Sequence, residues 1–233
     1  MTTADRRARE KRAVEEKILA AARDLFARRG YEGVTMRAVA EAIEYSPPVI
    51  YSHFRDKEAL LTRLCCDDFA RLASEAGLLA GVADPVERIR RLGRRYIRFA
   101  LEHPNHYRVM FMTRFPDHDL TEEELEVKSR PDADGYAFLR QAVRECISSG
   151  RFLPEIDDEE LATQTLWACV HGAAALAIDK ANDPWIEWAP IAERIALVCD
   201  APLRGMLLDP SHLAPLTDRR AKARTRAGKR GGR

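Results

Sequence analysis

The stretch from Val34 to Leu61, VTMRAVAEAIEYSPPVIYSHFRDKEALL, decides the fold. Its spacing predicts two short helices joined by a tight turn, followed by the start of a third helix. Thr35 is a suitable N-cap for the first of them, which we expect over 36–43. Pro47 and Pro48 fit the first two positions of the second, where their missing N–H groups would have no intrahelical partner. The double proline therefore fixes where the second helix begins.

The second helix is too short to bury itself, so other elements must hold it in place. We expect Ser46 to cap it, Ile50 and Phe54 to point into the core, and a longer helix to follow over 57–79. The side chains left on the outside are Val49, Tyr51, Ser52 and His53. Two short helices around a tight turn form a helix-turn-helix. The free face of the second helix is therefore predicted to lie against DNA.

A helix over 13–29 precedes this stretch and is expected to end at Gly30 in the C′ position. Residues 1–12 carry five basic side chains and no apolar anchor. Two interpretations stay open for them: a frayed, solvated terminus, or an arm that follows DNA phosphates.

The run ILAAARDLFARRGYEGVTMRAVAEAI, followed by YSPPVIYSHFRDKEALL, resembles the TetR family of transcriptional regulators over about residues 15–64. The resemblance implies a sequence-specific DNA-binding regulator. The chain departs from the family at Glu44, where glycine is common. A left-handed conformation there would cost about 1 kcal/mol; otherwise the turn closes differently.

The resemblance also implies DNA contacts for particular residues. Phosphates are expected at Thr35 and Arg37, and again at Lys57. The other residues expected at the DNA are Ser46, Pro47, Pro48, Val49, Tyr51, Ser52 and His53. The outer face of the second helix lacks Arg, Asn and Gln, so we expect contacts with thymine methyl groups and recognition of DNA shape. Each residue also has a plain interpretation as surface packing.

Longer helices are predicted after residue 84, over 84–102, 134–149, 157–180 and 190–199, with a broken continuation past Pro202. The 157–180 helix is apolar on nearly all sides in LWACVHGAAALAI, so it must be buried on all sides. We therefore expect a second copy to cover it, with two helices from each chain forming a four-helix homodimer interface.

The segments HPNHYRVMF and LWACVHG resemble the C-terminal ligand domain of TetR relatives with a Trp-His-Gly segment, here Trp167, His171 and Gly172. A small, largely apolar effector is expected among aromatic and methionine side chains. The candidate effector residues are Tyr96, Phe99, Phe111, Met112, Tyr136, Trp167 and His171. His171 is either the polar group of this site or a hydrogen-bonded core histidine.

Charge is unevenly distributed: residues 1–64 carry a net +3, residues 65–216 a net −9, and residues 217–233 a net +7. A polyanion would therefore meet the first or last part of the chain. The basic tail is predicted to be disordered, either binding DNA non-specifically or serving solubility. The arginines over 88–98 suggest a nucleic-acid patch or, as we favour, a solvated helix face.

No catalytic motif stands out, and the histidines and carboxylates lack the spacing of a closed metal site. We expect no enzyme activity, no cofactor and no metal. The five cysteines suggest buried free thiols, with a redox role for Cys65 and Cys66 as the alternative. Lacking a long apolar run or a signal peptide, the protein is expected in the cytoplasm.

The sequence thus predicts an all-α protein. We expect a basic flexible arm over 1–12, a three-helix DNA-binding domain over 13–62, a ligand-binding and dimerisation domain over 63–210, and a disordered tail over 211–233. The predicted function is a transcriptional regulator, most simply a repressor released from its operator by the effector. The alternative is a helical carrier or enzyme for a small hydrophobic molecule that does not bind DNA.

Overall fold

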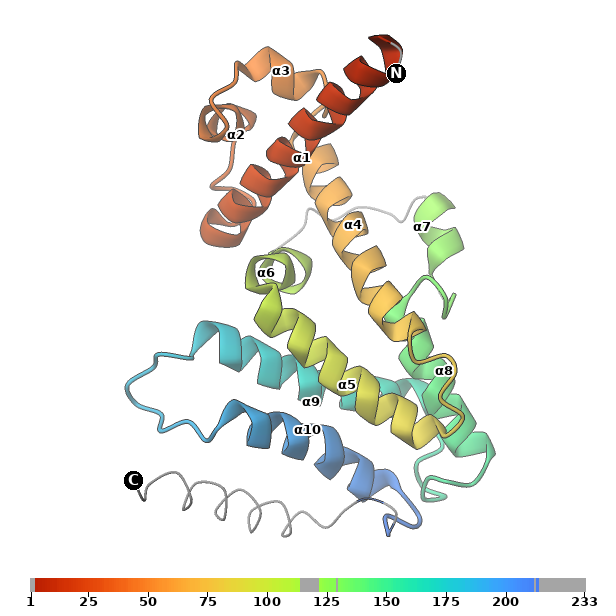
Figure 1. Cartoon of the computed structure of the whole chain (residues 1–233). Helices are drawn as coiled ribbons and strands as arrows, with labels where there is room; N and C mark the ends of the chain where they lie inside the picture. The colour runs from red at the N-terminus through yellow and green to blue at the C-terminus, as the bar shows by residue number, and fades with distance from the viewer. Residues whose placement is uncertain (1–2, 114–121, 129, 212, 214–233) are drawn as a thin grey trace, which may run out of the picture. The chain divides into compact units, whose positions relative to one another are not determined.

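A computed structural model of the 233-residue chain describes residues 3–113, 122–128, 130–211 and 213 (Figure 1). The described residues form helices and no β-strand beyond an isolated bridge between Phe152 and Leu207. The helices are α1 (Thr3–Arg29), α2 (Met36–Ala42), α3 (Pro47–Tyr51), α4 (Lys57–Gly77), α5 (Pro85–Glu102), α6 (Pro104–Met112), α7 (Glu122–Val127), α8 (Gly135–Ser148), α9 (Glu159–Asp179) and α10 (Ile191–Met206). The predicted all-α class is confirmed.

The chain divides into two compact units. Unit 1 comprises residues 1–75 and 99–135, and unit 2 comprises residues 76–98 and 136–233. Unit 1 therefore takes in α6, a segment distant in sequence from the helix-turn-helix. The predicted domain boundaries, 13–62 for DNA binding and 63–210 for ligand binding and dimerisation, stay a prediction.

Unit 1 is built around the apolar stripe of α1, which packs against α2 and α6. Ile18 and Phe26 of this stripe are buried together with Val39 of α2, Ile50 of α3 and Leu60 of α4. One face of α3 therefore packs on a core shared with α1, α2 and α4, and this packing stabilises a helix too short to be stable alone.

Glycines follow the ends of two helices, one of them Gly30 as expected. Gly30 and Gly150 both have positive φ, 67° and 66°, and the N–H of Gly30 donates to the carbonyl of Phe26 at 2.9 Å. Two expected boundaries were wrong. The first helix begins at Thr3 and not at residue 13, because residues 3–12 are rich in good helix formers and need no apolar anchor. The last helix continues through Pro202 to Met206 without the expected break.

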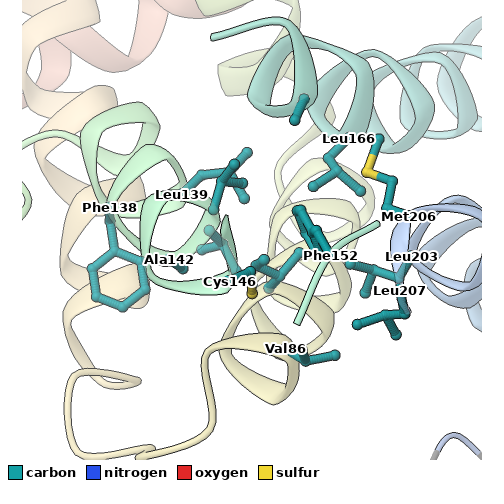
Figure 2. Close-up of a cluster of buried hydrophobic side chains, with 14 of the residues drawn as sticks. Val86, Phe138, Leu139, Ala142, Cys146, Phe152, Leu166, Leu203, Met206 and Leu207 are labelled. Carbon is teal, nitrogen blue, oxygen red and sulfur yellow. The ribbon is translucent and has the colours of Figure 1, made fainter. Parts of the chain in front are cut away.

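Unit 2 has its own core, formed by α5, α8, α9 and α10 with the segment after α8 (Figure 2). Phe152 lies between Cys146 of α8 and Leu203 of α10. Gly93 of α5 permits a close helix approach: a β-carbon there would lie 3.1 Å from the Cys199 Sγ and 3.2 Å from a methyl carbon of Val170.

Two of the α5 arginines, Arg88 and Arg90, do not lie on a solvated helix face. Arg88 is buried and paired with Glu145, while Arg90 donates to both carboxylate oxygens of Asp200, at 2.9 and 3.3 Å. Asp200 is completely buried in α10. The ion pairs therefore fasten α5 to its neighbours inside unit 2.

Helix α9 is, among the described residues, long and apolar enough to cross a membrane by length and composition alone. No membrane span had been expected from the sequence. Helices that pack inside proteins pass the same test, yet only 22% of this apolar window is buried within the chain. Most of this apolar window is therefore left uncovered by the rest of the described chain.

Candidate DNA interface and effector site

The turn between α2 and α3 keeps the left-handed backbone that the family resemblance implied. Glu44 has a φ of 60° despite carrying a side chain. The N–H of Tyr45 donates to the carbonyl of Ala40 at 3.0 Å, and that of Ile43 donates to the same carbonyl at 3.3 Å. The helix end is thus closed by its own backbone, so the angle between the two helices does not depend on a glycine.

Helix α3 presents one face to the core and one to solvent. Ile50 and, just beyond the helix, Phe54 are buried as predicted, whereas Tyr51 is 55% exposed. The hydroxyl of Ser52 donates to the carbonyl of Val49 at 2.7 Å, and the Ser46 side chain makes no capping hydrogen bond. Ser46 therefore occupies the N-cap position as expected, but its side chain makes no capping bond, because the two prolines leave fewer N–H groups to cap.

The start of α2 lies in the same helix-turn-helix. The Thr35 side chain accepts a hydrogen bond from the N–H of Ala38 at 3.1 Å, as expected of an N-cap. Arg37 is exposed and pairs with Glu41 across one helical turn at 2.9 Å. An exposed pair of this kind contributes little to stability, so the guanidinium can exchange its partner for a phosphate.

Of two half-buried predicted contact residues, Lys57 is held by contacts with Tyr31, whereas a ring nitrogen of His53 is left unpaired. The Lys57 ammonium donates to the carbonyl of Tyr31 at 2.9 Å and lies 3.9 Å from the centre of the Tyr31 ring. His53 is half-buried, and its Nδ1 has no hydrogen-bond partner within the described part of the chain. Lys57 keeps two further N–H donors after binding Tyr31, which matches the predicted role at a phosphate.

The ten predicted DNA-contact residues thus fall into two groups. Those exposed to solvent are Thr35, Arg37, Ser46, Pro48, Tyr51 and Ser52. Those half-buried are Pro47, Val49, His53 and Lys57. None is fully buried, so all ten retain some surface for DNA.

Four of the seven predicted effector residues lie together in unit 2. The indole N–H of Trp167 donates to the Tyr96 hydroxyl oxygen at 3.2 Å, and that oxygen lies 3.0 Å from the His171 Nδ1. The Tyr136 and Trp167 rings meet edge to face at 5.8 Å. Burial lowers the pKa of His171, which favours the neutral ring. The cluster is aromatic with one neutral polar group.

The rim of this cluster is charged. The Tyr136 hydroxyl donates to the Glu160 carboxylate, and burial together with this bond raises the pKa of Tyr136 to about 12. Arg144 pairs with both oxygens of the neighbouring Glu159, at 2.7 and 2.8 Å. Tyr136 therefore stays protonated and joins the apolar interior to a polar border.

The other three predicted effector residues belong to unit 1. Phe99 is buried and contacts the rings of His103 and His106, and Phe111 contacts the rings of Phe69 and Tyr107. Met112 is partly exposed. Their part in an effector site stays a prediction.

A buried ionic cluster in unit 1 was missed from the sequence. Asp68 of α4, only 2% exposed, accepts hydrogen bonds from Arg23 of α1 at 3.2 and 2.9 Å and lies 2.7 Å from the His106 Nδ1 of α6. Burial acts to raise the pKa of Asp68, but the bonds to His106 and Arg23 outweigh it and hold that pKa below its usual value. The available signal was an acidic residue within an apolar stripe.

No group of metal-ligating side chains occurs among the described residues. Asp117, His118 and Asp119 are ligand types whose spacing does not predict a closed metal site, and they lie outside the described residues. Cys65 is buried beside an exposed Cys66, and burial raises the pKa of the Cys65 thiol, with the nearby Asp68 charge adding to it. A raised pKa disfavours the reactive thiolate, which supports the interpretation of Cys65 as a core residue.

The fold and the helix-turn-helix define a two-part helical regulator. Residues 18–64 match the bacterial regulatory proteins of the tetR family, and residues 89–206 match the tetracyclin repressor-like C-terminal domain. The chain belongs to the TetR family.

Among known relatives, the HTH-type transcriptional repressor AcnR of Corynebacterium efficiens is 34% identical over 123 residues, which is 51% of this chain and 65% of AcnR. The HTH-type transcriptional repressor Rv1474c of Mycobacterium tuberculosis is 40% identical over 75 residues, 31% of this chain and 40% of that protein. The matched stretches thus span less than two thirds of these relatives.

Solved structures share the fold. The TetR-family regulator PfmR of Thermus thermophilus has a TM-score of 0.61 at 22% identity, covering 82% of this chain and 98% of PfmR. A protein of unknown function from Rhodococcus sp. RHA1 has a TM-score of 0.63 at 24% identity, covering 83% of this chain and 95% of its own.

Proposed function

We propose that this protein is a transcriptional repressor that binds operator DNA as a homodimer and is released by a small, largely apolar effector. Helix α3 carries the proposal. It begins at two prolines, is anchored by buried Ile50, and leaves Tyr51 and Ser52 exposed. A short helix supported from one side and open on the other has the form of a recognition helix.

The family supports both halves of the proposal. TetR-family regulators bind DNA operators and act as dimers, and release by an effector is typical of them. AcnR and Rv1474c, the relatives reported above, are named as repressors. These relatives support repression over activation for this chain.

The uncovered surface of α9 and α10 supports the homodimer. One face of α9 packs in the unit 2 core through Leu166, Val170 and Ala174. The large apolar side chains left exposed on the two helices are Leu161, Leu176, Ile191 and Leu197. A β-carbon at Gly172 would meet nothing within 4 Å. A second copy, related by a two-fold axis, would cover this surface as part of a four-helix interface.

The cluster of Tyr96, Tyr136, Trp167 and His171 is the proposed effector site. It offers aromatic surface for an apolar molecule and a neutral histidine for one polar group. Effector and DNA binding are then reciprocally coupled, so an effector that weakens operator binding must itself bind more weakly to the DNA complex.

The test is binding of purified protein to genomic DNA fragments, including the DNA that flanks its own gene, followed by gel shifts with the selected operator. Wild-type protein is expected to bind, with an affinity that falls steeply as salt rises. Replacing Tyr51 and Lys57 by alanine together should weaken binding by at least about tenfold, because both are proposed to contact the phosphate backbone.

Absence of any sequence-selected DNA would contradict the proposed function and favour a carrier of hydrophobic molecules. Tight binding that survives the double replacement would contradict the assignment of Tyr51 and Lys57. Trp185, which is 93% exposed and lies outside both sites, offers a matched control through Trp185→Ala.

A further inference from the structure

Helix α1 extends well beyond the core of unit 1. Residues 4–13 are helical and exposed throughout, and the first side chain packed on the core is the half-buried Val14. The extension therefore contributes no apolar burial to the fold. Its five basic residues are Arg6, Arg7, Arg9, Lys11 and Arg12.

The extension projects at the same end of unit 1 as α3, the end away from α6 (Figure 1). A side-chain contact supports this placement: the Lys17 ammonium lies 5.9 Å from the centre of the Tyr45 ring, in the turn that leads into α3. At 1.5 Å per residue, Lys11 and Arg7 lie about 9 and 15 Å beyond that level along the helix axis.

One face of the extension is in line with the apolar stripe of α1, and the opposite face is not. Ile18 and Val14 lie on the inward stripe of α1, and the same stripe continues at helical spacing through Lys11 and Arg7. Arg9 and Arg12 fall on the opposite side of the helix. The inward face thus changes from apolar to basic where it passes the helix-turn-helix.

We propose that the inward face of this extension, through Arg7 and Lys11, binds phosphates of the DNA backbone next to the site held by α3. The proposal rests on the proposed function, since it assumes that DNA occupies the open face of α3. DNA lying on that face would meet the extension on the side that continues the inward stripe. Arg6 has a carboxylate nearby at 3.6 Å, on Glu10, whereas no ion pair to Arg7 or Lys11 is found within the described chain.

The extension would act through charge alone. Phosphate contacts fix position and add affinity without reading bases. Each neutralised phosphate releases condensed counterions, so the logarithm of affinity falls with the logarithm of salt by about 0.9 per contact. The number of contacts can therefore be counted from the salt dependence.

The experiment compares two double variants of equal charge, Arg7→Gln with Lys11→Gln and Arg9→Gln with Arg12→Gln. Glutamine preserves helix propensity, and circular dichroism confirms that each variant is folded. Binding is measured by fluorescence anisotropy over a range of salt. The probe is the operator selected by the wild-type protein, extended by about 10 base pairs, roughly one helical turn, on each side.

The inward variant is expected to reduce the slope of log affinity against log salt by about 2–4. This range corresponds to the loss of up to two phosphate contacts in each of two subunits. The outward variant should change it by less than about 1. Equal changes in both variants, or no change in the inward one, would overturn the proposal.

The double alanine variant of Tyr51 and Lys57 separates this proposal from the proposed function. If it loses binding while the inward variant behaves as wild type, the helix-turn-helix assignment stands and the role of the extension fails. If the wild-type protein selects no DNA, both fail together.

Discussion

Among the described residues, each unit buries one carboxylate, and the two units neutralise it by different means. Asp68 in unit 1 is shared by an arginine from α1 and a histidine from α6, whereas Asp200 in unit 2 faces the arginines Arg90 and Arg94 of α5. The unit 2 carboxylate is therefore held by guanidinium groups alone, whereas the unit 1 carboxylate is held by one guanidinium group and one imidazole ring.

This difference matches the work proposed for each unit. In the proposed dimer, unit 2 contributes to a four-helix interface, and its buried ions join α5 to α10. In unit 1, the Asp68 carboxylate of α4 contacts Arg23 of α1 and His106 of α6. Changes at the two carboxylates should therefore differ in size.

The largest effect is expected from Asp200→Asn. It leaves Arg90 and Arg94 charged beside a neutral amide in a fully buried position. Breaking a buried pair in this way costs about 3–5 kcal/mol of unfolding free energy. Urea denaturation followed by circular dichroism measures it, and a loss below about 1 kcal/mol would show that the pair is not buried in solution.

Next in size is Gly172→Leu on α9. A β-carbon there meets nothing within the chain, so the fold of one copy should be unchanged. A bulky side chain on a closely packed two-fold interface should instead weaken self-association about 100-fold, or about 2.7 kcal/mol. Analytical ultracentrifugation at graded concentrations reports it; unchanged dimerisation would place the interface elsewhere.

A smaller loss, about 2 kcal/mol, is expected from Asp68→Asn, since hydrogen bonds to a charged group are lost. The pH dependence identifies the cause. Because the pKa of Asp68 is lowered in the folded state, its contribution is fully present above the unfolded pKa of about 3.9 and disappears as pH falls further. The difference between wild type and Asp68→Asn should thus shrink below about pH 4. A constant difference would rule out the charge as its origin.

The smallest effect is a gain. Glu44→Gly removes a left-handed non-glycine residue and should stabilise unit 1 by about 1 kcal/mol. The matched control is Gly30→Ala, at a φ of 67° with open space around it, which should destabilise by a similar amount. Calorimetric melting temperatures that do not move in opposite directions would contradict this account of backbone strain.

Local signals predicted much of the fold. Pro47, Thr35 and Gly30 set helix ends through their own backbone chemistry, and the stripe through Ile18 follows from helical spacing. The exposed face of α3 was predictable for the same reason. The pairing of Asp68 with Arg23 was not, because 45 residues separate them and nothing local selects one arginine among many.

The effector cluster shows the same limit. Trp167 and His171 are one helical turn apart, so their proximity follows from spacing. That Tyr96 meets them depends on how α5 packs on α9, which Gly93 permits through close approach. The sequence grouped these side chains with Phe99 and Phe111, since aromatic residues in a buried stripe look alike whichever unit they belong to.

The hydrogen bond from Trp167 to Tyr96 has a consequence for observing the molecule. Of the three tryptophans, Trp185 is exposed and Trp188 lies under the guanidinium of Arg194, at 4.0 Å. Replacing both by phenylalanine would leave one tryptophan, whose indole N–H and ring edge contact Tyr96 and His171. The proposed effector site would then carry its own optical reporter, and its occupancy could be followed without any label.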